Sequence, residues 1–483
     1  MKLKDLLANV PVLEIHADPE KEIEQVYYDS RKVTPGSLFV AVTGYAADGN
    51  RFIPMALERG AAAVVTAKRP QDDVPYILVE SDRLALALIG ANYYGHPAKS
   101  MTMIGVTGTN GKTSTTLLVK QILEQVTGKK VGLIGTMENL VGDEVIPTER
   151  TTPESFELQG LFARMRDALC SYVVMEVSSH AVSLERIGGV HFDVAAFTNL
   201  TEDHLDFHGT MENYCDAKAA LFQRCGRAVC NCDDPWFERI TKDAACPVLT
   251  ASVKGVGDLH AENVQLRSDG ISFLAVCKEE TVQVNLQIPG RFTVYNALTA
   301  LGIAHSLGIS LADAAAALSK AKGVRGRVEV VPTPGKPYTV LIDYAHTPDG
   351  LENVLTSVRD YCKGRLIAVF GCGGDRDSIK RPIMGKIGVS LSDLAVITSD
   401  NPRSEDPMAI ISDILKGVAE QEESYVVIEN RPKAIQYAMD KAQKDDIIIL
   451  AGKGHETYQE ICGVKHHLDE REIVAAYLEE ARN

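Results

Sequence analysis

The stretch from Met101 to Val126 constrains this chain more than any other part of its sequence. It begins with the apolar run MTMIGVT, continues through a glycine-rich turn, and enters a helical pattern at Thr113. A buried strand, a tight turn and a helix in this order aim backbone N–H groups and the positive end of the helix at one point, which suits a phosphate group. Lys112 is placed to reach the β- and γ-phosphates of a nucleotide, and the Thr113 hydroxyl to hold Mg²⁺. The usual phosphate-loop signature has a further glycine where this chain has Val106.

We therefore predict a nucleotide-binding loop built from Gly108, Thr109, Asn110, Gly111, Lys112, Thr113 and Ser114. The loop alone fits a GTPase-type switch as readily as an ATP-dependent ligase, because both bind a triphosphate in this way.

Apolar runs of strand length recur along the chain with helix-length segments between them, which indicates βαβ units and mainly parallel sheets. We predict an α/β protein of three domains. These are a small N-terminal α/β domain at 1–95, a central P-loop-type domain with a mainly parallel sheet at 96–325, and a Rossmann-like doubly wound domain at 326–483. In such sheets ligands bind beyond the carboxyl ends of the strands, so residues that follow each apolar run are the candidates for chemistry.

Composition excludes several classes of function. The net charge of −15 argues against general nucleic-acid binding, which needs an electropositive face. Every apolar run is shorter than the about 18 residues that a membrane span needs. The N-terminus has no apolar core typical of a signal peptide, so we expect a cytoplasmic protein. The ten cysteines lack the C-x₂-C pairs that zinc sites favour, so we expect them to be small apolar residues of the core.

A series of motifs extends over all three predicted domains. In chain order they are DSRKVTPGSLFVAVTGYAADG (29–49), TGTNGKTS (107–114), MEVSSH (175–180), TNLTEDHLDFHGTMENYCDAK (198–218), GRFTVYNALTA (290–300), GRVE (326–329), DYAHTPDGL (343–351), GCGGDRD (371–377), SDNPR (399–403) and AGKGHETY (451–458). Together and in this order they resemble the Mur ligase family, and within it the members that add meso-diaminopimelate.

The resemblance implies an ATP-dependent ligase of peptidoglycan synthesis. Its substrates would be ATP, UDP-N-acetylmuramoyl-L-alanyl-D-glutamate and meso-2,6-diaminopimelate, and the D-glutamate carboxylate would be activated as an acyl phosphate. Each chemical step brings negative charges together, so the site needs cations, which the family supplies as Mg²⁺ and lysine. The resemblance further implies a monomer without a nucleic-acid or membrane partner.

Four residues take catalytic roles by this resemblance: Lys112, Glu176, His204 and Lys218. The implied metal ligands are Thr113, Glu176, His204 and Lys218. Lys218 matches the lysine that the family carbamylates with CO₂, a reaction of the neutral amine, so burial must lower its pKa from about 10.4. Taken singly, Glu176 is also readable as an ordinary strand-end acid, His204 as a loop histidine and Lys218 as a solvated helix lysine.

The resemblance assigns further ATP contacts to Asn296, Arg327, Asp343 and His346. Thr293 stands where the family often has asparagine, and threonine keeps only one of the hydrogen bonds that the amide would offer.

The UDP-linked substrate is assigned to Ser30, Gly44, Tyr45, Ala46, Thr151, Thr152, Ser178, Ser179 and Arg186. Hydroxyls and a guanidinium suit a ligand rich in carbonyl and carboxylate oxygens. Ser30 has a simpler reading as a turn-forming serine.

The amino-acid substrate is assigned to Arg376, Asp400, Asn401, Pro402, Arg403, Gly452 and Glu456. Meso-diaminopimelate has a second carboxylate where lysine has none, and Arg403 offers a planar fork that fits a carboxylate and repels an amine. Glu456 can accept a hydrogen bond from the distal ammonium. Without the family context, DNPR is also readable as a strand-to-turn corner.

Three alternatives remain open at this point. The first is the L-lysine-adding version of the same ligase. The second is a ligase resembling folylpolyglutamate synthetase, for which DNPR and the N-terminal domain have no evident use. The third is a P-loop regulatory NTPase, which has no evident need for Glu176, His204 and Lys218 together.

Overall fold

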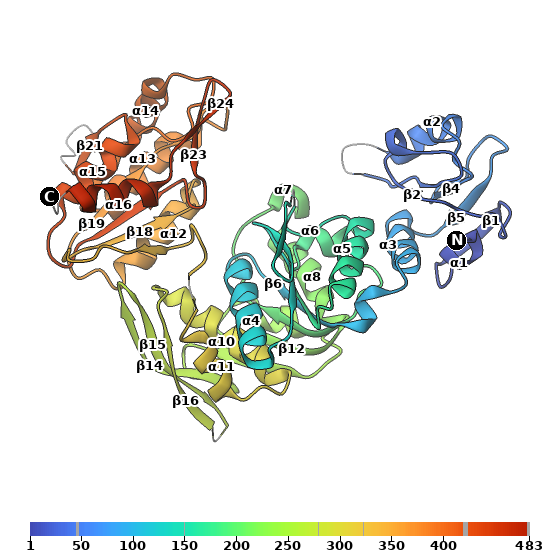
Figure 1. Ribbon diagram of the computed structural model, residues 1–483, viewed down its shortest axis with the longest axis horizontal. Coiled ribbons are helices and arrows are strands. Elements are labelled where there is room, and N and C mark those ends of the chain that lie inside the picture. Colours follow the sequence, from blue (N-terminus) through green and yellow to red (C-terminus); the bar gives the residue numbers. More distant parts are fainter. Residues whose placement is uncertain (45–47, 149, 279, 322, 419–423, 481–483) are drawn as a thin grey trace. The chain divides into compact units, whose positions relative to one another are not determined.

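The computed structural model describes residues 1–483 apart from 45–47, 149, 279, 322, 419–423 and 481–483. The described chain forms two compact units, Met1–His260 with Leu298–Ala314, and Ala261–Ala297 with Ala315–Asn483. Its three main sheets have five, eleven and six strands, which confirms the predicted α/β architecture (Figure 1). No helix within the described ranges has the length and apolar character needed to cross a membrane.

The N-terminal sheet has the order β1-β5-β4-β3-β2 and is parallel except for β1. Its strands are β1 (Val12–His16), β2 (Val26–Tyr27), β3 (Leu38–Val40), β4 (Ala63–Thr66) and β5 (Tyr76–Val79). Its helices are α1 (Leu3–Leu6), α2 (Ile53–Glu58) and α3 (Asp82–Tyr93). Apolar residues of α1 and α3 pack on one face of this sheet and those of α2 on the other, so that β3 and β4 are buried on both faces.

The central sheet has the order β16-β15-β14-β13-β12-β11-β6-β10-β7-β8-β9. Five of its strands are apolar runs of strand length, the kind of segment that the sequence predicts to form a parallel sheet: β6 (Thr102–Thr107), β7 (Val131–Ile134), β10 (Tyr172–Glu176), β11 (Phe192–Phe197) and β12 (Cys225–Asn231). They are parallel neighbours. Glu176 pairs with Val106 and Phe197 with Thr107, so three strands end together at the phosphate loop.

Helices cover both faces of this parallel part. They are α4 (Lys112–Thr127), α5 (Ser155–Asp167), α6 (Ser179–Ser183), α7 (Leu205–His208), α8 (Met211–Ala219) and α9 (Phe237–Thr241), followed in the chain by α10 (Arg291–Ser306) and α11 (Leu311–Leu318). Figure 1 shows α4 on one side of β6 and α5, α6 and α8 on the other, where apolar residues of the latter three join one buried cluster.

The sheet extends beyond what the sequence predicted. The additional strands are β8 (Asn139–Val141), β9 (Glu144–Ile146), β13 (Val248–Ser252), β14 (Leu259–Arg267), β15 (Gly270–Cys277) and β16 (Glu280–Leu286). β7 to β9 and β15 to β16 pair antiparallel. Several of these strands alternate buried and exposed residues rather than forming a continuous apolar run, which explains why they were missed.

The C-terminal sheet has the order β17-β18-β22-β19-β20-β21 and is parallel except for β17. Its strands are β17 (Glu329–Val331), β18 (Thr339–Asp343), β19 (Leu366–Phe370), β20 (Leu394–Ile397), β21 (Tyr425–Val427) and β22 (Ile447–Ala451). A separate hairpin consists of β23 (Tyr458–Ile461) and β24 (Val464–His467).

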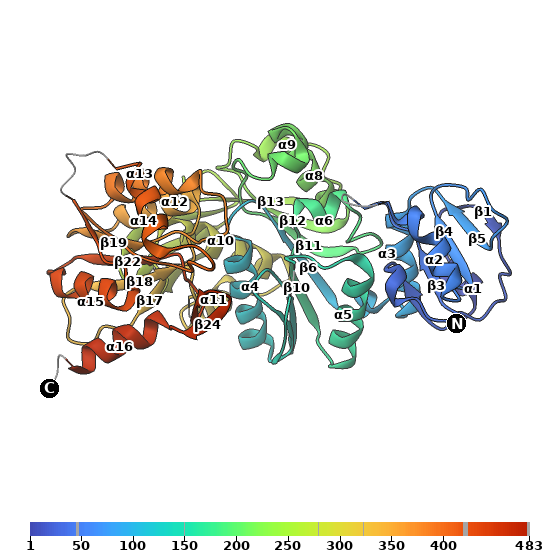
Figure 2. The same ribbon diagram turned by 90° about the horizontal axis from the view of Figure 1, so that it is seen from above.

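This sheet is doubly wound, as predicted. Its helices are α12 (Pro348–Arg359), α13 (Lys380–Leu391), α14 (Pro407–Leu415), α15 (Arg431–Lys441) and α16 (Glu470–Glu480). Apolar residues of α12, α13 and α14 pack in one core and those of α15 and α16 in another, and Figure 2 shows these two groups on opposite sides of β18, β19 and β22. The ten cysteines are all free, and six of them are buried.

Candidate active site

The phosphate loop is shaped by two glycines with positive φ. Gly108 has φ +143°, and a side chain there would come within 1.9 Å of the Thr198 hydroxyl. Gly111 has φ +84° and leads directly into α4. The end of β11 braces the loop, because Asn199 accepts hydrogen bonds from the backbone N–H of Thr109 at 2.8 Å and, through its side chain, from that of Asn110 at 2.9 Å.

Two lysines converge on one carbonyl of this loop. The Lys112 ammonium donates to the carbonyl oxygens of Gly108 at 3.0 Å and Thr109 at 2.8 Å. Lys218, on α8, donates to the same Gly108 oxygen at 2.9 Å. The structure therefore brings the predicted Lys218 to the predicted nucleotide loop.

Lys218 is 1% exposed, with its ammonium 4.5 Å from the centre of the Tyr214 ring. Burial, and then the charge of Lys112, lowers the pKa of Lys218 well below its ordinary value. A lowered pKa favours the neutral amine, which is the form that reacts with CO₂.

Glu176 lies at the end of β10, is 1% exposed, and contacts the first turn of α4. Its carboxylate accepts hydrogen bonds from the Thr113 hydroxyl at 2.9 Å and from both the backbone N–H and the hydroxyl of Thr136 at 3.0 Å. A carboxylate and a hydroxyl at this spacing are hard oxygen donors, which suit Mg²⁺ with part of its water shell retained.

His204 begins α7 in a left-handed conformation, φ +53°, and its side chain is 47% exposed. Its ring lies 4.8 Å from that of His180 and 6.2 Å from that of Tyr214, the residue that also contacts Lys218. Across the described ranges, no three His, Cys, Asp or Glu side chains form a metal-binding group by themselves. The predicted metal set, in which only Glu176 and His204 are of these types, thus stays a prediction.

Three of the residues predicted to bind the UDP-linked substrate, Thr151, Thr152 and Arg186, lie beside Glu176. The Thr151 hydroxyl lies 3.0 Å from that of Thr136, and the buried Thr152 hydroxyl donates to the Glu176 carbonyl at 2.8 Å. Arg186 donates to the Thr152 carbonyl at 3.1 Å and forms an ion pair with Glu154 at 2.9 Å. Glu154 was not predicted to be part of the site, because its spacing from the other site residues follows no recognisable motif.

Ser178 and Ser179 follow β10 directly. The Ser178 hydroxyl caps α6 by accepting from the Ala181 N–H at 3.2 Å. The Ser179 hydroxyl lies 2.9 Å from Nε2 of His208, a buried histidine that the sequence analysis did not single out.

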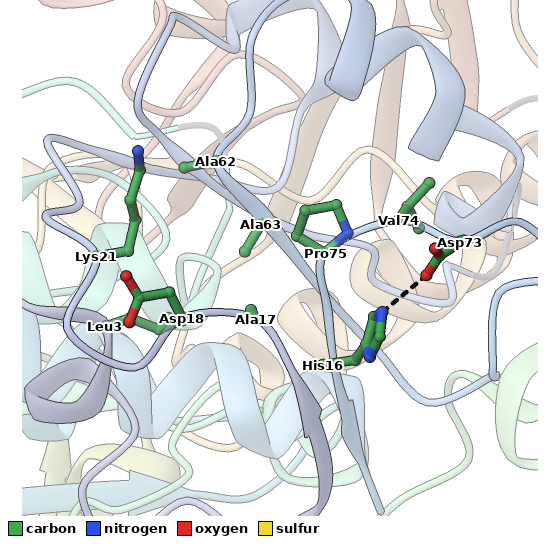
Figure 3. A pocket seen from close by; sticks show the side chains of 10 residues that line it. All are labelled: Leu3, His16, Ala17, Asp18, Lys21, Ala62, Ala63, Asp73, Val74 and Pro75. Atoms are coloured by element: carbon green, nitrogen blue, oxygen red, sulfur yellow. Dashed lines mark hydrogen bonds and ion pairs between the residues drawn. The ribbon is translucent and has the colours of Figure 1, made fainter.

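In the N-terminal domain, Ser30 is 6% exposed and its hydroxyl lies 3.5 Å from the sulfur of Met55. Gly44 is partly buried, and the predicted residues Tyr45 and Ala46 lie outside the described residues. The same domain contains a cavity of about 470 Å³ (Figure 3). Its lining contains none of the predicted site residues: it is formed by Leu3, His16, Ala17, Asp18, Lys21, Ala62, Ala63, Asp73, Val74 and Pro75.

Asn296 and Thr293 lie on α10 and are 4% and 2% exposed. The Thr293 hydroxyl donates to the Pro289 carbonyl at 2.9 Å, one turn earlier. The donor of the Thr293 hydroxyl is therefore used in a hydrogen bond within the protein.

Asp343 ends β18, and its two carboxylate oxygens accept from the backbone N–H groups of Val328 and Ala345, each at 2.8 Å. Burial raises its pKa above the ordinary value. The Arg327 guanidinium lies 5.4 Å from the centre of the Tyr344 ring. His346 bonds through Nδ1 to the Tyr344 carbonyl at 2.8 Å. The predicted residues Arg327, Asp343 and His346 thus form one cluster at this strand end.

The residues predicted to bind the amino acid also share one region. Asp400, Asn401 and Pro402 are buried beyond the end of β20. Glu456 accepts from the Asn401 amide at 2.9 Å. Gly452 has φ +117°, and a side chain there would come within 2.5 Å of the Asp400 carboxylate.

Arg403 is held in place before any ligand binds. Its backbone has φ +51° and pairs with β23, donating to the Glu460 carbonyl at 3.0 Å and accepting from the Cys462 N–H at 2.7 Å. Its guanidinium donates to the Gly374 carbonyl at 2.8 Å and lies 3.4 Å from the Glu460 carboxylate. Arg376, by contrast, is exposed.

Three family models match the chain: "Mur ligase family, catalytic domain" over 22–94, "Mur ligase middle domain" over 106–304, and "Mur ligase, glutamate ligase domain" over 326–454. The chain belongs to the Mur ligase family. The resemblance inferred from the motifs is confirmed.

Curated relatives of this Mur ligase match along the full chain. The UDP-N-acetylmuramoyl-L-alanyl-D-glutamate--2,6-diaminopimelate ligase of Clostridium tetani is 47% identical over 99% of this chain and 100% of its own. The protein of the same name from Caldanaerobacter subterraneus is 47% identical over 100% of both. A solved structure titled with the same enzyme name covers 100% of this chain and 99% of its own, with a TM-score of 0.77 and 30% identity.

Proposed function

We propose that this Mur ligase joins meso-2,6-diaminopimelate to the D-glutamate of UDP-N-acetylmuramoyl-L-alanyl-D-glutamate with consumption of ATP, as a step of peptidoglycan synthesis. The observation that carries the proposal is the full-length match, at 47% identity, with relatives of that name. The clusters around Glu176 and Asp400 supply the groups that such a reaction needs.

In the first step, an oxygen of the D-glutamate γ-carboxylate attacks the γ-phosphorus of ATP. The bond from this phosphorus to the β-phosphate oxygen breaks, ADP departs, and the glutamate carries an acyl phosphate. Lys112 would leave its carbonyl partners in the loop and neutralise the charge on the transferred phosphoryl group. Thr113 and Glu176, with His204 and the carbamate form of Lys218 proposed below, would hold Mg²⁺, whose charge would offset the repulsion between carboxylate and triphosphate.

In the second step, an amine of diaminopimelate attacks the acyl carbon, the carbon–oxygen bond to phosphate breaks, and the amine nitrogen loses a proton as the amide forms. We assign the binding of the amino acid to Asp400, Asn401, Arg403 and Glu456. Asn296, Arg327, Asp343 and His346 remain our proposal for ATP contacts, and Thr151, Thr152, Ser178, Ser179 and Arg186 for the muramoyl-peptide.

We propose that Lys218 carries a carbamate. Its neutral nitrogen would attack CO₂ and lose a proton, which leaves an anionic group in place of an ammonium. Burial at 1% exposure and the lowered pKa both support this chemistry. A cytoplasmic location is proposed because the reaction consumes ATP, and the monomeric state stays a prediction from the resemblance.

Arg403 favours meso-diaminopimelate over the alternative substrate L-lysine. A half-buried guanidinium that is fixed by Gly374 and β23 fits the distal carboxylate of diaminopimelate, whereas the side-chain ammonium of lysine would face a like charge.

The test is phosphate release by the purified chain with ATP, the UDP-muramoyl-dipeptide and one amino acid. We expect release only when all three substrates are present, with meso-diaminopimelate strongly preferred to L-lysine. Arg403→Met should raise the KM for meso-diaminopimelate by roughly 30-fold, the value of a charged hydrogen bond lost from a buried site. Arg359→Met is the control, because Arg359 is an exposed arginine of the same domain paired with Asp393. Phosphate release that needs no amino acid would support a regulatory NTPase, and preference for L-lysine would support the alternative ligase.

A further inference from the structure

The C-terminal domain buries a lysine for which the proposed reaction has so far given no role. Lys453 follows β22 and is 0% exposed. Glycines flank it, with φ +117° at Gly452 and +55° at Gly454, and a side chain at Gly454 would come within 2.6 Å of Tyr344. The two glycines therefore let the backbone turn tightly enough to send the Lys453 side chain inward.

The Lys453 ammonium contacts three of the residues assigned to the amino-acid substrate. It lies 3.0 Å from the Asp400 carboxylate and 3.4 Å from that of Glu456, and it donates to the side-chain oxygen of Asn401. Asn401 in turn donates to Glu456 at 2.9 Å. Side chains from two strand ends thus share one buried cation.

The Lys453 ammonium sets the net charge of the cluster that it forms with Asp400, Asn401 and Glu456. Without it, two carboxylates would face each other in a buried place, and one of them would take up a proton. With it, one positive and two negative charges leave a net negative charge for a substrate ammonium to meet. Burial alone would raise the pKa of Asp400, but Lys453 and then Arg431 keep it below its ordinary value.

A second buried ion pair supports the arrangement from behind. The Arg431 guanidinium lies 2.8 Å from the Glu470 carboxylate and donates to the Ala451 carbonyl at 2.8 Å, at the end of the strand that leads to Lys453. Both partners are at most 1% exposed. The lysine is therefore fixed by its backbone as well as by its partners.

We propose that Lys453 is a positioning residue for the amino-acid substrate: its ammonium fixes Asp400, Asn401 and Glu456 in the orientation that binds an ammonium group of a diamino acid. This inference rests on the proposed function. The role of Lys453 goes beyond that function, because it assigns substrate affinity to a residue that is shielded from solvent and acts only through its neighbours.

The experiment compares Lys453→Met with Lys465→Met in steady-state kinetics. Lys465 is a matched control, because it is exposed on β24 and its ammonium lies over the same Tyr458 ring, at 4.1 Å, as that of Lys453 does at 5.8 Å. We expect Lys453→Met to raise the KM for meso-diaminopimelate at least 20-fold, with the KM for ATP and for the UDP-muramoyl-dipeptide within twofold of the wild type. Lys465→Met should leave all three unchanged.

A purely structural role predicts something different. If Lys453→Met only reduces the folded fraction, the apparent kcat falls while the KM for meso-diaminopimelate stays at the wild-type value, and the proposal is overturned. Lys453→Arg keeps the charge and guards against a variant that does not fold; we expect its KM for the amino acid to rise at least threefold but less than that of Lys453→Met, and an unchanged value would overturn the proposal. A wild-type chain that uses neither diaminopimelate nor lysine would instead refute the proposed function.

Discussion

Lys218 shows how a single buried amine acquires reactivity from its surroundings. A lysine on a solvated helix would stay protonated, whereas here burial and the nearby ammonium of Lys112 lower its pKa. The same environment places its nitrogen 2.9 Å from the Gly108 carbonyl of the phosphate loop. A carbamate at this position would bring negative charge to the place where a metal ion bound to the loop needs it.

We expect Lys218→Ala to lower kcat by at least about 100-fold, the order of effect seen when a group that stabilises transition-state charge is removed. A short-chain carboxylate added to the assay should restore part of the activity, because it can replace the missing carbamate, and bicarbonate should not. Lys242→Ala removes an exposed lysine of the same domain and serves as the control. An unimpaired Lys218→Ala enzyme would end the carbamate proposal.

Two glycines near the ends of α4 differ in what surrounds them: Gly108 lies in the loop that precedes the helix, and Gly128 directly follows it. A side chain on Gly108 would overlap the Thr198 hydroxyl at 1.9 Å, whereas Gly128 has nothing within 4 Å. Both have positive φ, +143° and +67°. Alanine substitutions at Gly108 and Gly128 therefore separate the free-energy cost of a positive φ from the cost of steric overlap with a neighbouring side chain.

Gly108→Ala should lower kcat/KM for ATP by more than about 100-fold, because the loop must shift before a nucleotide can bind. Gly128→Ala should cost about 1 kcal/mol of stability from its left-handed backbone alone and leave the KM for ATP unchanged. Thermal unfolding and ATP kinetics of both variants check this. Equal effects of the two substitutions on ATP use would contradict the geometric argument.

The strands that position the site could be predicted because parallel strands buried on both faces form continuous apolar runs. β6, β10 and β18 are of this kind, and the chemistry-bearing residues Glu176 and Asp343 stand at their ends. β14 and β16 alternate buried and exposed residues and carry charged side chains, so no apolar run marked them.

The side chains that complete the site were harder to predict. Lys453 was overlooked although its motif was recognised, because its partner Asp400 lies in another strand-end loop and their pairing exists only in the folded chain. The same holds for Glu154, which directly precedes α5 and pairs with Arg186 in the turn that follows α6. Local pattern finds residues that stand at strand ends, but it does not show which buried charges offset each other.

Folding lowers the pKa of several groups, and each of them makes the folded chain less stable in acid. Burial, and then the charge of His180, lowers the pKa of His208 to about 4. The unfolded chain takes up this proton below about pH 6.5 and the folded chain does not. The contribution is therefore fully present above that pH and is lost as the pH falls toward about 4. Asp48, whose pKa Lys68 lowers to about 2, acts with the same sign at lower pH.

The shift from about 6.5 to about 4 corresponds to about 3 kcal/mol, and after solvent screening we expect the free energy of unfolding to fall by about 2 kcal/mol from this histidine alone between pH 7 and pH 4. Urea unfolding of the wild type and of His208→Gln over this range measures the difference, since glutamine keeps a polar side chain but does not titrate. Parallel pH profiles for the two proteins would show that His208 stays exposed to protonation in the folded state.

Glu176 contacts residues of two proposed substrate sites. The Glu176 carboxylate contacts Thr113 at the nucleotide loop, while its backbone carbonyl accepts from Thr152 on the side assigned to the muramoyl-peptide. If these sites are as we propose, a ligand that displaces this strand end would move the anchor of the other. Donor and acceptor of the phosphoryl group would then be aligned through a single residue at the end of a buried strand.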